Sequence, residues 1–224
     1  IILIGASQDH DYKFRIYNSD GSAAQMCGNG MRCVARYLYD EKISAKTSMR
    51  MDTLAGTVVP EVVTDKQGGV TGVRVDMGIP QLSCSRIPFL CEAEKAVEVP
   101  LAVGGGSIRV TAVSMGNPHA VVFVDDIDEV DVAGIGPAIE THEWFPEKTN
   151  VEFIEVISAS ELRMRVWERG AGITLACGTG ACAALVAASL TGRSGDRAVV
   201  HLDGGDLELF WDRESGHIYK QGPA

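Results

Sequence analysis

Two cysteines stand in the same short motif at two distant places in the chain. Residues 25–38 read QMCGNGMRCVARYL and residues 175–190 read LACGTGACAALVAASL, so Cys27 and Cys177 each begin a Cys-Gly-x-Gly turn that leads into helix-forming sequence. A thiol at a helix N-terminus lies beside unpaired backbone N–H groups and the positive end of the helix dipole, and both favour a thiolate. The motif therefore predicts two acid–base groups, each beside an anion-binding site.

The glycines of these turns support a function in both. Gly28 and Gly30, and likewise Gly178 and Gly180, leave the backbone N–H groups open to a substrate. For one such turn, a cysteine that only packs would be the better interpretation, but two matching turns favour chemistry. Opposed thiols suit inversion of a carbon that bears an acidic proton, because one thiolate removes hydrogen from one face and the other thiol delivers hydrogen to the opposite face. The helix N-termini would stabilise the negative charge that develops on a carboxylate.

The other four cysteines carry no such motif. We expect Cys33 and Cys182 to be small packing residues inside their helices, and Cys84 and Cys91 to be packing residues or incidental. Six cysteines in 224 residues are too few for a disulfide scaffold, and without C-x-x-C a structural zinc site has little support. The sequence therefore predicts a cytoplasmic protein with reduced thiols and no metal.

Composition excludes several classes of function. The hydrophobic content of 46% and the charged content of 22% are typical of a soluble globular protein. The net charge of −10 argues against nucleic acid and anionic membrane as partners. No apolar run reaches membrane-spanning length and no signal peptide is visible; because the chain opens on Ile1 in what reads as a strand, we expect residues to be missing at both ends.

Common cofactors also lack their motifs. No lysine stands in a glycine-rich turn, where a pyridoxal phosphate Schiff base would be held. No G-x-G-x-x-G follows a predicted strand, as dinucleotide binding would require. We therefore expect chemistry without a cofactor.

The elements that position the two turns are predicted to be mostly strands. Alternating or β-branched runs occur throughout: YKFRIY, TVVPEVV, GVRVDM, SIRVTAV, HAVVFV, LRMRVW, RAVVHL and LELFW. Two helices are predicted, over residues 30–43 and 180–191. The second is apolar or small all round, so it should be wrapped by sheet on every side. The first carries Arg32, Arg36 and Asp40, so one side of it is expected to reach solvent.

The order of these elements suggests two copies of one plan, each with strands, a Cys-Gly-x-Gly turn and a central helix. Gly and Pro interrupt the strand pattern at residues 77–83, MGIPQLS. We predict an N-terminal domain over residues 1–80, a C-terminal domain over residues 81–216, and a tail, residues 217–224, that returns to the first domain.

The quoted segments also carry a family resemblance over essentially the whole chain. YNSDGSAAQMCGNGMRC and ERGAGITLACGTGACA closely resemble the two signature segments of the diaminopimelate epimerase family, and SMGNPHAVVFVDD, GPAIETHEWFPEKTNVEF and the closing GPA are similar to it too. The resemblance implies a cofactor-independent enzyme that interconverts LL- and meso-diaminopimelate for lysine and cell-wall synthesis. It also implies an α+β fold of two pseudo-symmetric domains, each a mixed β-sheet around a central α-helix, with the active site in the cleft between them, and a homodimer.

The resemblance assigns roles to individual residues. Cys27 and Cys177 match the two catalytic bases. His119 and Glu168 match residues that tune the pKa of the thiols. The positions that match substrate-binding residues are Asn18, Gly28, Asn29, Asn117, Asn150, Glu168, Arg169, Gly178 and Thr179. The family's Asn-Asp-Phe segment and a substrate-binding Gln would lie before Ile1, and Ile173 stands where many members carry Glu.

Two other functions stay open at this point. A proline racemase-like enzyme would use two cysteines in the same way, although several asparagines and Arg169 fit a long, doubly zwitterionic substrate better than a small cyclic imino acid. A redox protein would use Cys27 and Cys177 as a reversible disulfide. Assays of substrate turnover distinguish the proline racemase-like enzyme from a diaminopimelate epimerase. Activity that requires reductant and no metal would argue against the redox protein.

Overall fold

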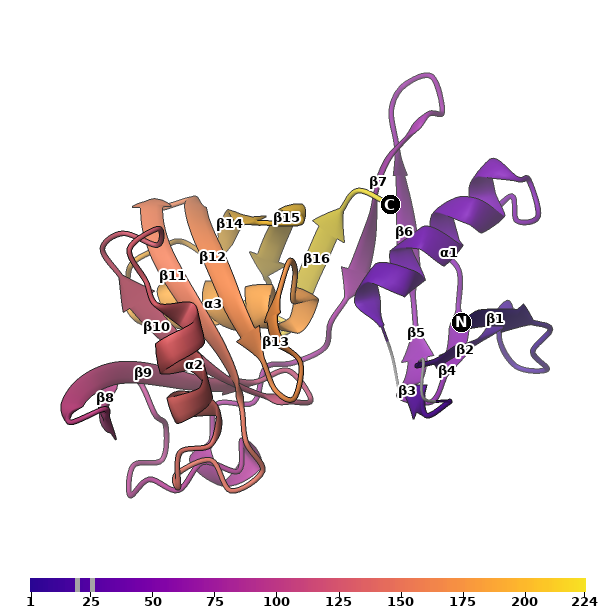
Figure 1. Ribbon diagram of the computed structural model, residues 1–224. Coiled ribbons are helices and arrows are strands. Elements are labelled where there is room, and N and C mark those ends of the chain that lie inside the picture. Colours follow the sequence, from indigo (N-terminus) through magenta and orange to yellow (C-terminus); the bar gives the residue numbers. More distant parts are fainter. Residues whose placement is uncertain (19–20, 25–26) are drawn as a thin grey trace. The chain divides into compact units, whose positions relative to one another are not determined.

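The computed structural model describes residues 1–18, 21–24 and 27–224, so Ser19, Asp20, Gln25 and Met26 of the first signature segment lie outside the described residues. The chain forms two compact units (Figure 1). Unit 1 comprises Ile1–Asp76 and Lys220–Ala224, and unit 2 comprises Met77–Tyr219. The domain bounds predicted from the sequence remain a prediction.

Unit 1 combines two groups of paired strands with one helix. Its elements are β1 (Ile2–Gly5), β2 (Tyr12–Tyr17), β3 (Ala23–Ala24), α1 (Gly28–Asp40), β4 (Met51–Thr53), β5 (Gly56–Val58), β6 (Pro60–Thr64) and β7 (Val70–Asp76). The first sheet has the order β1-β2-β4-β5, with β3 on β2; β2 and β4 are parallel and the other pairs antiparallel. Strands β6 and β7 form an antiparallel pair, and β16 (Ile218–Gly222) joins them on β7. Helix α1 packs on β6 and β7.

Unit 2 is a mixed sheet with two helices. Its elements are a short 3-10 helix η1 (Cys84–Arg86), β8 (Val99–Val103), β9 (Gly106–Ser114), β10 (Pro118–Val124), α2 (Val132–Glu140), β11 (Asn150–Ser158), β12 (Glu161–Glu168), β13 (Gly172–Thr174), α3 (Gly178–Leu190), β14 (Arg197–Leu202) and β15 (Gly205–Trp211). The strand order is β15-β14-β12-β11-β10-β9-β8, with β13 on the edge of β12. The pairs β10/β11 and β12/β14 are parallel, and the others are antiparallel.

Helix α3 is the centre of unit 2, as its all-apolar sequence predicts. Residues 180–188 are all buried, and the helix contacts β9, β10, β11, β12, β14 and β15 (Figure 1). A helix without a solvent face requires cover on all sides, and the curved sheet supplies it. The glycine at position 192, with φ of +71°, follows the end of the helix in the left-handed conformation that glycine adopts without strain.

Helix α2, which the sequence did not predict, covers the other face of the sheet from α3 (Figure 1). Its sequence VAGIGPAIE contains two glycines and a proline, all poor helix formers. Asp131 caps it by accepting a hydrogen bond from the Gly134 N–H at 2.9 Å. Gly136 packs so closely on Trp167 that a Cβ there would lie 2.6 Å from the indole Cγ. Tertiary packing therefore overrides local propensity in this helix.

The structure confirms the predicted fold class and corrects some predicted details. Both cysteine helices begin two residues earlier than predicted, directly after Cys27 and Cys177. The run TVVPEVV is divided between β5 and β6 rather than forming one strand. Arg32, expected on a solvent face, is buried, because its Nε donates to the Pro223 carbonyl at 3.0 Å. Within the described residues, no helix is both long and apolar enough to cross a membrane.

Candidate active site

Cys27 and Cys177 both occupy the N-cap position of a 13-residue helix. Their backbones are extended in the same way, with φ/ψ of −137°/110° and −124°/108°. Each cysteine carbonyl accepts the first helical hydrogen bond, from Met31 N–H at 2.8 Å and from Ala181 N–H at 2.9 Å. The sulfur atoms are therefore held beside the first-turn N–H groups, as the motif predicts.

In unit 1, the predicted residues Cys27, Gly28 and Asn29 lie at the start of α1. The Cys27 thiol is partly exposed and accepts a hydrogen bond from the Gly30 N–H, with a donor–sulfur distance of 3.4 Å. Gly28 and Asn29 form the first turn, and the Asn29 Oδ1 accepts from Arg32 Nη1 at 3.1 Å. Asn18 follows β2, and its Nδ2 donates to the Ser22 hydroxyl at 3.0 Å.

In unit 2, the structure brings three predicted residues together at the ends of β10 and β11. His119 and Asn150 are direct partners in the parallel register of these strands. The His119 Nε2 lies 3.1 Å from the Asn117 Oδ1 in the loop before β10. The Asn150 amide donates to the Pro118 carbonyl at 2.9 Å and accepts from the Arg169 backbone N–H at 3.0 Å. These hydrogen bonds to other protein groups hold the side chains of Asn117 and Asn150 in place.

Glu168 is the last residue of β12, and Arg169 follows it next to Asn150. The Thr174 hydroxyl of β13 donates to the Glu168 carboxylate. The Arg169 side chain is exposed, and its Nη1 donates to the Glu147 carbonyl at 2.9 Å. Ile173, on β13, is 46% exposed. Arg169 is thus held from one side by a backbone carbonyl, an arrangement that suits a guanidinium that binds a carboxylate with its other donors.

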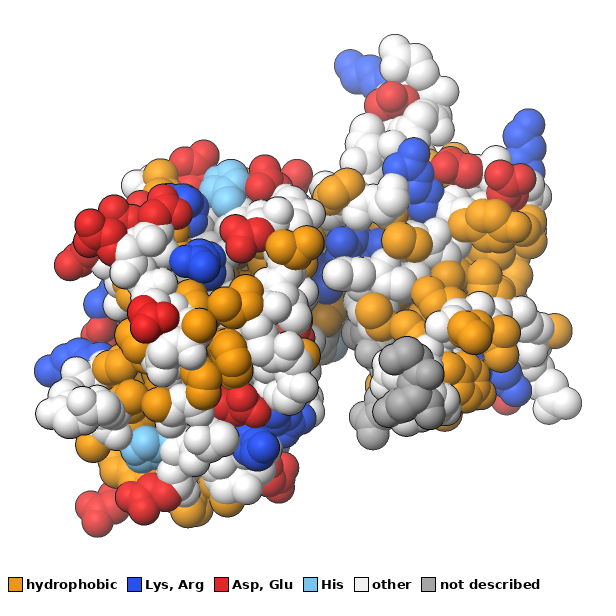
Figure 2. All heavy atoms as spheres, in the orientation of Figure 1, with side chains coloured by type: hydrophobic (Ala, Val, Ile, Leu, Met, Phe, Trp, Pro, Cys, Tyr) orange, Lys and Arg blue, Asp and Glu red, His pale blue; other side chains and the backbone are white. Residues whose placement is uncertain are grey.

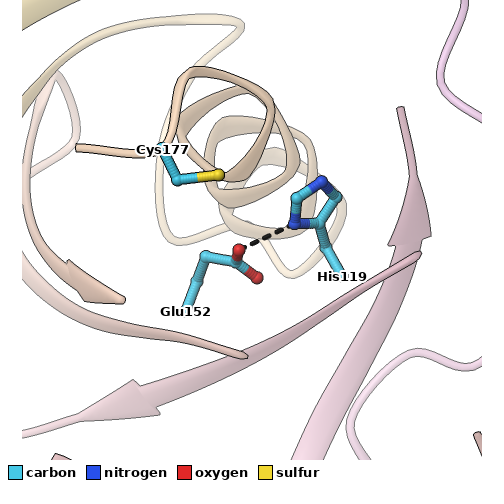
Figure 3. A group of neighbouring side chains, drawn as sticks. All are labelled: His119, Glu152 and Cys177. Atoms are coloured by element: carbon cyan, nitrogen blue, oxygen red, sulfur yellow. Dashed lines mark hydrogen bonds and ion pairs between the residues drawn. The ribbon is translucent and has the colours of Figure 1, made fainter. Parts of the chain in front are cut away.

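The start of α3 adds the second thiol. Gly178 and Thr179 form the first turn, and the Thr179 hydroxyl lies 3.5 Å from the Cys177 sulfur. Cys177 is only 4% exposed, and its thiol points toward His119 and Glu152 (Figure 3). The thiol, the imidazole and the carboxyl offer atoms within 4.8 Å of one another. All three side chains are buried.

Glu152 is the functional candidate that the sequence analysis missed. It lies on β11 with its side chain fully buried, and its Oε1 is 2.7 Å from the His119 Nδ1. Its Oε2 is a buried oxygen with no hydrogen-bond partner within the described part of the chain. The available signal was the period of β11: Glu152 shares the face of Ile154, which packs in the α3 core, whereas Val151 and Phe153 face the α2 side.

Gly180 also makes room for Glu152, a packing role that adds to the one predicted for this glycine. A Cβ at Gly180 would lie 2.5 Å from the Glu152 Oε1. The equivalent Cβ at Gly30 in α1 would meet the Ile2 Cδ1 at 2.9 Å. Because Gly180 has no side chain, the Glu152 carboxyl can lie against the first turn of α3.

The electrostatics of this cluster keep Cys177 protonated. Burial raises the pKa of the Cys177 thiol to about 12, and the negative charges of Glu152 and Glu168 add to this effect, while the Thr179 hydroxyl opposes it. Burial also raises the pKa of Glu152, although His119 acts in the opposite direction. The expected thiolate-favouring effect of the helix N-terminus is thus outweighed at Cys177, which is a thiol at neutral pH.

The same three residues, His119, Glu152 and Cys177, are the one potential metal-ligand group within the described residues. Their arrangement does not fit an ion well. A tetrahedral zinc ion, about 2 Å from each nitrogen or oxygen ligand, keeps its ligand atoms more than about 3 Å apart. The His119 and Glu152 atoms instead lie 2.7 Å apart in a direct hydrogen bond. The cluster is therefore better suited to moving or holding a proton.

The remaining cysteines differ partly from expectation. Cys182 is fully buried, as predicted for a packing residue, but Cys33 is exposed on α1. Cys84, which is buried, and Cys91 have no shared motif, yet their sulfur atoms lie 3.3 Å apart. Burial and this contact raise the pKa of Cys84 to about 12.

Comparison with known proteins gives both a family and a fold. The family model described as diaminopimelate epimerase matches residues 1–83 and 111–224. A diaminopimelate epimerase from Desulforapulum autotrophicum is 54% identical over 224 residues, which are all of this chain and 79% of that protein. One from Heliobacterium modesticaldum is 52% identical over 224 residues, again all of this chain and 80% of that protein.

Solved structures of lower identity share the fold. A Bacillus anthracis phenazine biosynthesis protein of the PhzF family has a TM-score of 0.71 and 17% identity, over 99% of this chain and 80% of that one. A hydroxyproline epimerase from Agrobacterium vitis has a TM-score of 0.66 and 18% identity, over 98% of this chain and 69% of that one. At such identities the likeness concerns the arrangement of helices and strands alone.

Proposed function

The chain belongs to the diaminopimelate epimerase family, and from this membership and its site we infer how it interconverts LL- and meso-diaminopimelate in lysine biosynthesis. The observation that carries the mechanism is the pair of N-cap cysteines with matching backbone conformations. Inversion of an amino-acid α-carbon needs one group to remove hydrogen and another to deliver hydrogen to the opposite face. Cys27 and Cys177 are the two groups that we assign to these steps.

In the resting enzyme the two cysteines have different roles, one as hydrogen donor and the other as base. Cys177 is buried beside Glu152 and Glu168, which hold it as a thiol, so it is the hydrogen donor of the resting enzyme. The reaction then requires Cys27 to act as the thiolate that removes the α-hydrogen. After one turnover the roles are exchanged, and either reverse turnover or exchange with solvent restores them. This mechanism requires both sulfur atoms to reach the same substrate carbon.

The remaining predicted residues are proposed to bind the substrate. The first-turn backbone N–H groups at Gly28 and Gly178, with the side chains of Asn29 and Thr179, would hold the carboxylate at the reacting carbon, where negative charge develops. Such donors are effective because they are already oriented before reaction.

A second group recognises the distal, non-reacting end of diaminopimelate. Arg169 suits its carboxylate, because a guanidinium forms two parallel hydrogen bonds to that group. The carboxylate of Glu168 suits an ammonium group. The polar amides of Asn18, Asn117 and Asn150 complete the proposed set of hydrogen-bonding partners.

Hydrogen exchange with solvent tests the two-thiol mechanism directly. In heavy water, the first product formed should already carry deuterium, because the delivered hydrogen comes from a thiol equilibrated with solvent. The unreacted isomer should carry almost none at early times, because the thiol that removed its hydrogen returns that same hydrogen. Early mass spectra of separated isomers, taken in both directions, give the result. Unlabelled product, or equal label in both isomers from the start, would contradict two separate bases.

We also propose that the enzyme acts as a cytoplasmic homodimer on free diaminopimelate, without metal or organic cofactor. Free thiols in a reducing compartment suit catalysis by thiol and thiolate. On the face drawn in Figure 2, acidic and basic side chains are intermixed over unit 2, and the net charge of −10 disfavours nucleic acid and anionic membrane as partners. Light scattering of the reduced protein measures the assembly, and turnover after dialysis against a chelator tests the metal independence; a monomer, or activity restored only by metal, would overturn these two statements.

A further inference from the structure

The carboxyl group of Glu152 is buried at a place where an apolar residue would be expected. Glu152 lies between Val151 and Phe153 on a central strand, and all three are at most 1% exposed. A buried carboxyl costs free energy unless each oxygen finds a partner, so such a group needs a reason. One oxygen bonds the His119 ring at 2.7 Å, and the other has no partner within the described residues.

The contacts of this carboxyl and of its partner His119 connect it to the Cys177 thiol and to Asn117. Oε1 lies against the backbone of α3 at Gly180, where a Cβ would approach it to 2.5 Å. The carboxyl and the His119 ring both lie beside the Cys177 thiol (Figure 3). His119 in turn reaches Asn117 through its other ring nitrogen, at 3.1 Å. The chain of contacts thus runs from the thiol region to an asparagine of the proposed substrate site.

We propose that Glu152 is a positioning residue for the Cys177 step: it fixes the His119 ring and holds a carboxyl group under the N-terminus of α3. This inference rests on the proposed function, because it assigns a purpose only if Cys177 is a catalytic base. The Glu152 Oε1–His119 Nδ1 bond orients the ring so that Nε2 faces the Asn117 oxygen.

The carboxyl also counters the helix N-terminus. The titratable groups that face Glu152 are His119 from β10, Glu168 from β12 and Cys177 from α3. The partial positive charge of a helix N-terminus stabilises a thiolate, whereas a carboxylate beside the same thiol destabilises it. With Glu152 and Glu168 present, Cys177 stays protonated and able to donate hydrogen.

The test compares Glu152→Gln with Glu140→Gln. Glutamine keeps the size of the side chain and removes its charge. Glu140 is a matched control because it is also buried in unit 2, where it accepts from the Trp167 indole N–H at 2.6 Å and from the Gly170 N–H at 3.1 Å. The first measurement is the ultraviolet absorbance of thiolates between about pH 7 and about pH 10, with the Cys177→Ala spectrum subtracted. The second is the pH profile of kcat/KM.

Loss of the Glu152 charge should make Cys177 more acidic. We expect the thiolate fraction of Cys177 at a given pH in this range to rise about tenfold, as for a pKa lower by one unit, and the alkaline limb of kcat/KM to move to lower pH. Glu140→Gln should leave both unchanged even if it lowers the melting temperature. Unchanged titration of Cys177 in folded Glu152→Gln, or the same shift in Glu140→Gln, would overturn the proposal.

A second variant covers the case in which Glu152→Gln does not fold. Glu152→Asp keeps the acid but withdraws it by one methylene from His119 and α3, so it should give a smaller shift in the same direction. If Glu152→Gln does not fold, an unchanged titration of Cys177 in folded Glu152→Asp would defeat the inference. The thiolate titration does not depend on turnover, so a wild-type protein inactive on diaminopimelate would count against the proposed function and not against the titration result.

Discussion

The first turns of α1 and α3 have the same sequence pattern and backbone but different surroundings. Both helices have 13 residues and an extended cysteine at the N-cap. At the third helical residue, the glycine of α1 faces the aliphatic Ile2, whereas the glycine of α3 faces the carboxyl of Glu152. Cys27 accepts a hydrogen bond from the first turn, but Cys177 makes no such capping bond and is almost fully buried.

This difference shows what a local motif determines and what it leaves to tertiary structure. The Cys-Gly-x-Gly pattern places a thiol at a helix N-terminus in both units. The ionisation of that thiol depends on residues outside the motif, such as Glu152 on β11 for Cys177. Two equal motifs can therefore supply the unequal partners, a thiol and a thiolate, that inversion requires in each turnover.

The largest expected effect comes from removing either thiol. Cys27→Ala and Cys177→Ala should each lower epimerisation by about 10²- to 10⁴-fold or more, because neither group can replace the other on its own face of the carbon. Cys33→Ala is the control, since Cys33 is an exposed cysteine on α1. Isomer ratios followed by chromatography, with circular dichroism to confirm folding, give the measurement. Near-normal turnover in either alanine variant of the N-cap cysteines would refute the assignment.

The two glycines should respond differently to a methyl group. At Gly180, alanine would displace a carboxyl that is fully buried and bonded to His119, so we expect a loss of about 1–3 kcal/mol in the free energy of unfolding. At Gly30, alanine meets the end of the Ile2 side chain, which is not fully buried, and the cost is offset by a helix-propensity gain of about 1 kcal/mol. Denaturant unfolding of both variants measures the difference. Equal losses would mean that the two turns are packed alike.

Substitution of Arg169, which lies in unit 2, should change substrate binding and not stability. Arg169→Lys keeps the charge but loses the planar pair of donors, so kcat/KM should fall about tenfold or more, equivalent to about 1.4 kcal/mol. Arg163→Lys is the control, because Arg163 forms a surface ion pair with Asp128 at 3.0 Å. A Lys variant at position 169 with parental kcat/KM would return this arginine to a role as a solvated surface charge.

The smallest expected effect is the part of the pH dependence of stability that Cys177 contributes and that Cys177→Ala lacks. Its pKa is raised to about 12 when folded, so above the ordinary thiol range unfolding releases a proton that the folded state retains. Stability from this group is therefore complete below about pH 8.5 and falls as the pH rises toward 12. Between about pH 8 and about pH 9.5, the wild type should lose about 1 kcal/mol more than Cys177→Ala in urea unfolding. A parallel loss in both proteins would show that Cys177 ionises as readily folded as unfolded.

Much of the fold follows from local sequence. The alternating runs at residues 12–17 and 162–167 are strands, and the all-apolar stretch after Cys177 is the buried helix α3. Helix α2 was not predictable in this way, because Gly136 and Pro137 disfavour a helix locally. It forms because Gly136 of this helix can pack on Trp167 of strand β12.

The site was predictable to a similar degree. The candidate cysteines stand out because their motif is contiguous, and the asparagines are candidates only through the family resemblance. Glu152 was missed, because a single glutamate in a strand is usually a solvent-facing residue. The period of β11 places it on the face of Ile154, but only the assembled sheet shows it buried beside His119. The protonated state of Cys177 has the same origin, because burial depends on long-range packing.

The discontinuity of unit 1 also has a consequence during synthesis. Strand β7 pairs with β16, and Arg32 of α1 donates to the carbonyl of Pro223, so unit 1 draws on residues that are translated after those of unit 2. Unit 2 is continuous in sequence, Met77–Tyr219, and holds its own core around α3. The order of translation therefore differs from the order of completion: unit 2 can fold while unit 1, with Cys27 already synthesised, still lacks β16.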